Sequence, residues 1–195
     1  MATLKLIRES KDKGLLLLGL TEEGESANYT VSVTLYEEIG CPSVGDVLDE
    51  DSVSAIKYAD TRLRAKKKAL SILAYADNNQ RTLYSKLIRA GFCRQVASDT
   101  VDEMVALGYV NEKRQLERLI LNEANVKLRG AGRIIPALVT KGYSSSAVRE
   151  VLSGLVADGE IDFTKNAHSL IEKKLGDFSD EEEIRKLLYK NGFKI

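Results

Sequence analysis

Few side chains in this sequence have the types and spacing that covalent or metal chemistry needs. His168 is the single histidine, so one chain cannot build a paired-histidine site. Cys41 and Cys93 lie far apart without metal-type spacing, and we predict ordinary thiols, with Cys93 packed in a helical core. The carboxylate run 180–183 fits a helix start, where acidic side chains complement the helix dipole. The sequence therefore predicts no catalytic residue and no bound metal.

Glycine-rich phosphate binding is not indicated either. The chain lacks the Gly-x4-Gly-Lys-Ser/Thr pattern that cradles a nucleotide, so no nucleotide cofactor is predicted. Gly130-Ala131-Gly132 is a lone Gly-x-Gly that no predicted strand precedes. We predict that it loosens the junction between two helices instead of holding a phosphate.

Charge is distributed unevenly along a chain whose formal net charge is zero. Residues 1–60 carry a net −7, residues 61–149 a net +10 and residues 150–195 a net −3. A basic middle between acidic ends favours a polyanionic partner for the middle alone, although a solvated lysine-rich surface explains the pattern about equally well.

The basic middle supplies the candidate binding residues. Lys127, Arg129 and Arg133 lie at a predicted junction between helices, and Lys141 follows. Arg129 and Arg133 are four residues apart, which predicts that they share a helix face. We expect four earlier residues to extend the same strip: Lys66, Lys67, Arg89 and Arg94.

The first forty residues read as β structure. Thr3–Glu9, Leu15–Leu20 and the alternating Tyr29–Leu35 predict a three-stranded antiparallel meander, which needs a covering layer. We predict a β module at 1–48 covered by a long helix at 49–76, with Asp51 as its cap. The apolar run Leu15–Leu18 is too short to span a bilayer, and the N-terminus lacks a secretory pattern, so we expect a cytoplasmic protein without membrane contact.

An internal repeat is the most informative feature of the helical remainder. A shift of 51 residues aligns the apolar positions of the segment from Leu83 to Ile120 with those of the segment from Ile134 to Ile171. The same shift aligns two pairs of glycines, Gly91 with Gly142 and Gly108 with Gly159. A further shift of 50 starts a third copy that ends after one helix, at Gly192-Phe193.

Each full copy predicts three helices that cannot bury their own apolar faces. Glycines end the first two helices, and Asn111 or Asp162 caps the third. Such units stack on their neighbours, so we predict a mainly α fold of tandem three-helix repeats in an extended array behind the small N-terminal antiparallel β meander. The predicted ranges are repeat one at 77–126, repeat two at 127–176 and a partial repeat three at 177–195.

The cadence Leu-x3-Leu-x3-Gly-aromatic in a unit of about fifty residues resembles the RecX family. The resemblance covers roughly residues 69–195 and is strongest over Lys127–Tyr143, a basic-Gly pair followed by Ile, Leu and the terminal Gly. The N-terminal β segment is similar to the extension in the branch from low-GC Gram-positive bacteria.

The resemblance implies a monomeric, non-enzymatic regulator in DNA repair, homologous recombination and the SOS response. Proteins of the family bind the RecA filament on single-stranded DNA and mostly inhibit RecA; duplex DNA is a further expected partner. The eight basic residues named above are then the expected RecA and DNA contacts.

The sequence departs from the family pattern at two places, and two other functions fit a chain of helical repeats. Asn78-Asn79 stands where the family often has Arg-Ser, and Asn111-Glu112 where it usually has Asp-Asp. Three-helix units also resemble helix-turn-helix domains, so a tandem DNA-binding protein or repressor is one alternative. The predicted second helix of repeat one, Arg94–Leu107, carries Asp99, Asp102 and Glu103, which counts against it. A helical scaffold that binds only proteins is the other alternative.

Overall fold

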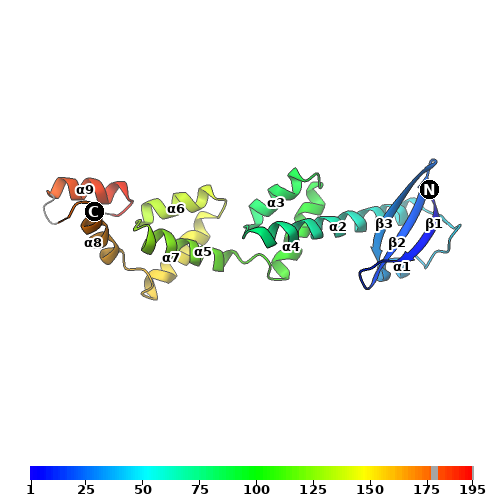
Figure 1. Cartoon of the computed structure of the whole chain (residues 1–195), viewed down its shortest axis with the longest axis horizontal. Coiled ribbons are helices and arrows are strands. Elements are labelled where there is room, and N and C mark those ends of the chain that lie inside the picture. Colours follow the sequence, from blue (N-terminus) through cyan, green and yellow to red (C-terminus); the bar gives the residue numbers. More distant parts are fainter. Residues whose placement is uncertain (177–179, 195) are drawn as a thin grey trace. The chain divides into compact units, whose positions relative to one another are not determined.

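The computed structural model describes residues 1–176 and 180–194, in two compact units (Figure 1). Unit 1 comprises Met1–Ala76 and Tyr84–Met104, and unit 2 comprises Asp77–Leu83 and Val105–Ile195. The N-terminal elements are β1 (Ala2–Glu9), β2 (Leu15–Glu22), β3 (Glu25–Ser32), α1 (Val33–Glu38), β4 (Val47–Leu48) and α2 (Glu50–Tyr75). The later elements are α3 (Gln80–Arg89), α4 (Arg94–Ala106), α5 (Glu112–Leu121), the π-helix η1 (Asn122–Val126), α6 (Ala131–Thr140), α7 (Ser145–Ala157), α8 (Phe163–Lys174) and α9 (Glu181–Lys190).

The N-terminal sheet is antiparallel with strand order β3-β2-β1-β4, so the predicted meander is confirmed and gains one short edge strand. The third strand is shorter than its alternation predicted. It ends at Ser32, whose hydroxyl accepts the backbone N–H of Leu35 and caps α1. The prediction of a strand through Leu35 is therefore wrong, because an N-cap at Ser32 outweighs the local apolar alternation.

Helix α2 covers this sheet, as predicted. Val53 and Ile56 belong to the same buried cluster as Leu4, Leu18 and Val31 of the strands. The cap is Asp49, whose carboxylate accepts the N–H of Ser52 at 2.7 Å. The prediction of Asp51 as the cap is wrong, because Asp51 already lies in the first turn of the helix.

The helix bounds repeat as the sequence predicted. Helices α6, α7 and α8 begin at 131, 145 and 163, each 51 residues after α3, α4 and α5 begin at 80, 94 and 112. Helix α9 begins at 181, 50 residues after α6. Equivalent apolar side chains are buried in both copies, for example Met104 and Leu155. Predicted caps are confirmed at Asn111 and Asp162, and the predicted terminal glycines have positive φ.

The predicted boundary between repeats two and three adjoins residues 177–179, which lie outside the described residues. The division of the chain into residue ranges stays a prediction. Units 1 and 2 instead divide the chain within α3, since Gln80–Leu83 belongs to unit 2 and the remainder of the helix belongs to unit 1.

Gly130 and Gly132 join partial repeat three to repeat two by direct backbone contact. The Gly130 N–H donates to the Asn191 carbonyl and the Gly132 N–H to the Gly192 carbonyl, both at 2.9 Å. A Cβ at Gly130 would lie 2.3 Å from the Gly192 oxygen. The prediction that these glycines loosen a helix junction is wrong, because they permit one of the closest approaches in unit 2.

The equivalent junction between repeats one and two uses a side chain. Asn79 occupies the position of Gly130 one repeat earlier, and its Nδ2 donates to the Lys141 carbonyl at 2.9 Å. Its Oδ1 accepts the N–H of Thr82, so Asn79 also caps α3. The Asn79 carboxamide thus occupies the space between repeats one and two. At the junction between repeats two and three, the backbone of Asn191 and Gly192 occupies the equivalent space beside Gly130 and Gly132.

Cys93 is exposed, so its predicted core packing is wrong: it immediately precedes α4, whose buried side chains begin at Val96. His168 is exposed on α8, as a surface residue of repeat two. In the described residues, no helix has the length and apolar character needed to cross a membrane.

Candidate functional site

The candidate site centres on the segment that links repeat one to repeat two. After α5 the backbone widens into η1, whose last bonds include the Lys127 N–H to the Asn122 carbonyl. Leu128 then takes a left-handed conformation with φ of 51°, which is unusual for a branched side chain. Single-turn π-helices and strained residues occur often at functional sites, so this segment is where a binding role is expected.

Arg129 and Arg133 do not share a helix face. Helix α6 begins only at Ala131, so Arg129 lies in the connection before the helix and Arg133 within its first turn. The spacing rule fails here because it holds only when both residues belong to one continuous helix.

Lys127 and Arg129 both bind Glu123, a carboxylate that is only 3% exposed. Lys127 Nζ lies 2.7 Å from Glu123 Oε1, and the Arg129 guanidinium pairs with Oε2. Burial alone raises the pKa of Glu123, but the hydrogen bonds and charges of Lys127 and Arg129 outweigh it, so this pKa lies below its ordinary value. Both cations therefore have a structural task in addition to their partial exposure to solvent.

Arg133 reaches partial repeat three. Its Nη1 donates to the Lys190 carbonyl at 2.8 Å, next to the backbone contact of Gly130 with Asn191. We call Lys127, Arg129, Arg133 and Glu123 the junction cluster. Three cations and one carboxylate give it a net +2, which suits an anionic ligand such as phosphate.

Lys141 lies at the other junction described above. Its carbonyl accepts from Asn79, while its side chain is exposed and has no ion pair among the residues described. Beside it, the buried Gln115 accepts the Tyr143 hydroxyl and donates to the Asn78 carbonyl, which fixes the start of α3 against α5 and α6. Lys141 is thus held by its backbone and leaves its amine available.

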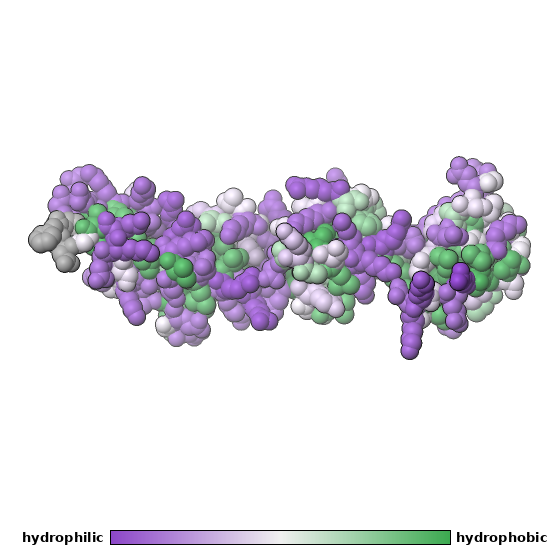
Figure 2. Space-filling model, viewed as in Figure 1, coloured by the Kyte–Doolittle hydropathy of each residue, from purple (hydrophilic) through white to green (hydrophobic). Residues whose placement is uncertain are grey.

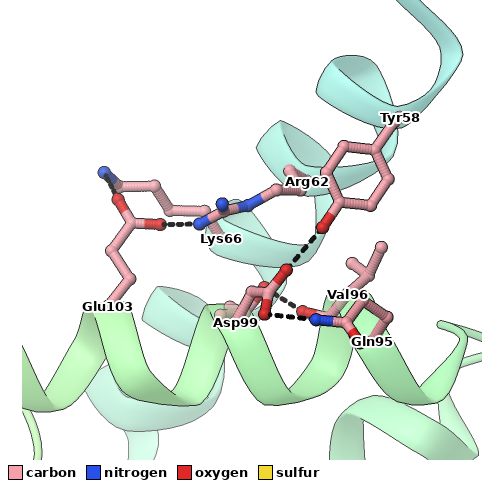
Figure 3. Close-up of polar contacts among 8 residues, drawn as sticks. Tyr58, Arg62, Lys66, Gln95, Val96, Asp99 and Glu103 are labelled. Atoms are coloured by element: carbon pink, nitrogen blue, oxygen red, sulfur yellow. Dashed lines mark hydrogen bonds and ion pairs between the residues drawn. The ribbon is translucent and has the colours of Figure 1, made fainter. Parts of the chain in front are cut away.

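Unit 1 holds the other four predicted residues. Lys66 Nζ lies 2.5 Å from Glu103, which also accepts from Arg62 (Figure 3). Lys67 pairs with Asp12. Lys66 therefore joins α2 to α4. Arg89 ends α3 and Arg94 begins α4, and both are exposed without an ion pair in the described part of unit 1. That all eight residues form one strip stays a prediction.

Sequence reasoning missed Glu123, Lys190 and the role of Gly192. Alignment of the third copy offered a signal for the last two, since Gly192 occupies the position of Gly142 at the repeat end. Nothing in the local sequence marked Glu123 as buried. In the described residues, no three side chains of His, Cys, Asp or Glu lie together as a metal site would need. The visible face of the helical part is mainly hydrophilic, as expected for a surface of charged side chains (Figure 2).

Comparison with known proteins agrees with the resemblance stated from the repeat. No family model matches the chain. The regulatory protein RecX of Clostridioides difficile is 28% identical over 130 residues, which cover 67% of this chain and 59% of that relative. The regulatory protein RecX of Caldanaerobacter subterraneus is 22% identical over 174 residues, 89% of this chain and 85% of the relative.

Solved structures share the fold. A crystal structure of regulatory protein RecX superposes with a TM-score of 0.74 at 20% identity, over 100% of this chain and 95% of the other. RecX from Lactobacillus salivarius gives a TM-score of 0.60 at 19% identity, over 70% of this chain and 90% of the other. With the repeat, the β module and these relatives all in agreement, the chain is similar to RecX proteins over most of its length and shares their fold.

Proposed function

We propose that this chain is a non-enzymatic cytoplasmic regulator that binds the RecA filament on single-stranded DNA as a monomer and mostly inhibits it. The relatives carry the name regulatory protein, which supports the regulatory role. The observation that carries the proposal is the junction cluster, a net +2 site on a segment with a π-helix and a left-handed leucine.

Repeated units favour binding to a repeating partner. A filament offers the same surface at regular intervals, and each additional contact along one chain acts at a high effective concentration. The junction cluster and Lys141 belong to successive repeat junctions of unit 2, so one chain offers more than one contact to an anionic partner. Every phosphate that is neutralised releases counterions, and binding should weaken with salt by a slope of about −0.7 per contact on single strands.

The helix-turn-helix alternative conflicts with the position of α4. Its acidic face is occupied by α2, because Asp99 accepts the Tyr58 hydroxyl and Glu103 accepts Arg62 and Lys66. A helix that reads the major groove needs a face free to meet bases. In unit 1 this face of the second repeat helix is therefore committed within the protein.

RecA ATPase activity on single-stranded DNA, titrated with this protein, tests the proposal. Wild type should inhibit, and the triple variant Lys127→Gln, Arg133→Gln, Lys141→Gln, which keeps Arg129 on Glu123, should need at least about tenfold more protein, because three exposed cations are removed from the two repeat junctions. Lys5→Gln, Lys11→Gln, Lys13→Gln removes the same charge from exposed positions of the β module and should inhibit as wild type does.

Each competing function gives a different result. A sequence-specific repressor would discriminate between duplex sequences and would bind naked DNA as well as RecA-coated DNA. A protein-only scaffold would show no salt-sensitive DNA affinity. Either result, or a triple variant that inhibits at the wild-type concentration, would contradict the assignment.

A further inference from the structure

A pocket beside the first turns of α5 in unit 2 has no assigned role. It encloses about 340 Å³, a volume typical of small-ligand sites. The residues that line it all belong to unit 2: Asp77, Gly108, Tyr109, Asn111, Arg114, Gln115 and Arg118. Two arginines against one aspartate give this lining a net +1. We call it the Tyr109 pocket.

The local sequence places an aromatic ring and two arginines at this pocket. Gly108 has a φ of 75° in the turn after α4, and Tyr109 follows it with 56% of its surface exposed. Arg114 and Arg118 are both exposed and lie four residues apart within one continuous helix, so they share a face of α5. The Asn111 side chain accepts the backbone N–H of Arg114, so the protein itself caps this helix end.

The two arginines differ in their partners. Arg118 pairs with Asp77, but the two side chains stay 67% and 57% exposed. Such a surface pair is weak, so an anion can displace Asp77 from Arg118 at small cost. Arg114 forms no ion pair with any residue in the ranges 1–176 and 180–194. The pocket therefore offers one unpaired guanidinium and a second that a phosphate can recruit.

Repeat two shows that the fold does not require these side chains. The shift of 51 residues places Tyr109 on Glu160 and Arg118 on Ser169. Helix α8 nevertheless begins 51 residues after α5 and is capped in the same way. Because the same helix forms with an acid and a serine at these positions, the ring and the second arginine of repeat one are available for binding.

We propose that the Tyr109 pocket binds one nucleotide, with its base stacked on the Tyr109 ring and its phosphate bound by Arg114 and Arg118. Every base has a flat face that stacks on an aromatic ring, and the guanidinium fork matches a phosphate. The proposal rests on the proposed function, since the nucleotide then belongs to the single strand. A free nucleotide presents the same two groups, so the experiment includes both sources. The junction cluster, by contrast, offers cations without an aromatic ring.

The chain contains no tryptophan, so Tyr109→Trp places a single fluorescent probe at the pocket of the full chain. Titration with oligothymidylate of about ten nucleotides, without RecA, should quench this fluorescence, and rising salt should weaken the binding. Glu160→Trp puts the probe at the equivalent position of repeat two and should be quenched at least about fivefold less. An abasic strand of the same length keeps the phosphates but has no base to stack, and it should not quench.

Thymidine monophosphate separates the two sources of the nucleotide. The strand should bind at least about tenfold more tightly than the monophosphate, because neighbouring phosphates add further contacts. Equal affinities would overturn the assignment to a strand.

Two double variants test the location by introducing the residues of repeat two. Tyr109→Glu with Arg118→Ser should weaken binding of a labelled oligothymidylate, followed by anisotropy, at least about tenfold. Leu107→Asp with Lys113→Thr makes the same charge change at exposed positions outside the pocket, and should weaken it less than about twofold. Tyr109→Phe keeps the ring and should bind as wild type does.

Three results would overturn the pocket: equal quenching of the two tryptophan variants, equal quenching by the abasic strand and oligothymidylate, or equal loss of binding in the two double variants. Oligoglutamate bound as tightly as oligothymidylate would overturn it too, since an acidic peptide has no base. Circular dichroism separates loss of the pocket from loss of the fold. Quenching without RecA inhibition would support the pocket and contradict the proposed function, whereas RecA inhibition without quenching would do the reverse.

Discussion

Replacing Arg129 with methionine removes one of two cations that hold the buried Glu123 carboxylate. Breaking a buried ion pair by deleting one partner costs about 3–5 kcal/mol. Here Lys127 still binds Glu123, and the Arg129 side chain is 34% exposed, so solvent screening reduces the loss. We expect the free energy of unfolding of unit 2 to fall by about 2 kcal/mol at pH 7, which corresponds to a Tm lower by about 8–16 °C for a unit of this size.

The pH dependence follows from the direction of the pKa shift. The pKa of Glu123 in the folded protein lies below its unfolded value, so its stabilising contribution is fully present above the unfolded value of 4.5. This contribution is lost as the pH falls through the lower, folded pKa. The difference between wild type and Arg129→Met should therefore be largest near neutral pH and shrink steadily below about pH 4.

Urea unfolding followed at several pH values measures both effects. Lys141→Met removes an exposed cation without an ion pair in the described residues, and it should change stability by less than about 0.5 kcal/mol. An equally small effect of Arg129→Met at pH 7 would refute the structural role of Glu123. So would a loss of stability that is the same at pH 7 and pH 3.

A further prediction concerns the glycine junction between repeats two and three. Gly130→Ala should lower stability by roughly 2 kcal/mol and raise amide exchange in α9, because its Cβ would lie 2.3 Å from the Gly192 oxygen; unchanged exchange would contradict the contact.

Features that depend on local sequence were predictable. The terminal glycines, the caps at Asn111 and Asp162 and the buried repeat positions follow from conformational freedom, side-chain hydrogen bonds and period, all of which neighbouring residues determine. The end of β3 at Ser32 was missed although its cause is also local. There, alternation and capping compete, and alternation was the weaker signal.

The binding site was predictable only in part. The basic residues of the middle segment were found by composition, but their partners lie elsewhere in the chain: Arg133 meets Lys190, and Lys66 meets Glu103. The neighbouring sequence does not indicate that Glu123 is buried, since a glutamate between Asn122 and Ala124 is predicted to lie on the exposed face of a helix. Tertiary contact decides which cations are committed within the protein and which are available.

The two repeat junctions of unit 2 differ in how they respond to force. At Asn79 a side-chain amide bridges to the Lys141 carbonyl, and water can replace that single bond while both backbones stay in place. At Gly130 and Gly132 the backbones themselves are joined, with no side chain between them to yield. Under load along the repeat axis, the first junction is therefore compliant, whereas the second holds until α9 is released in one step.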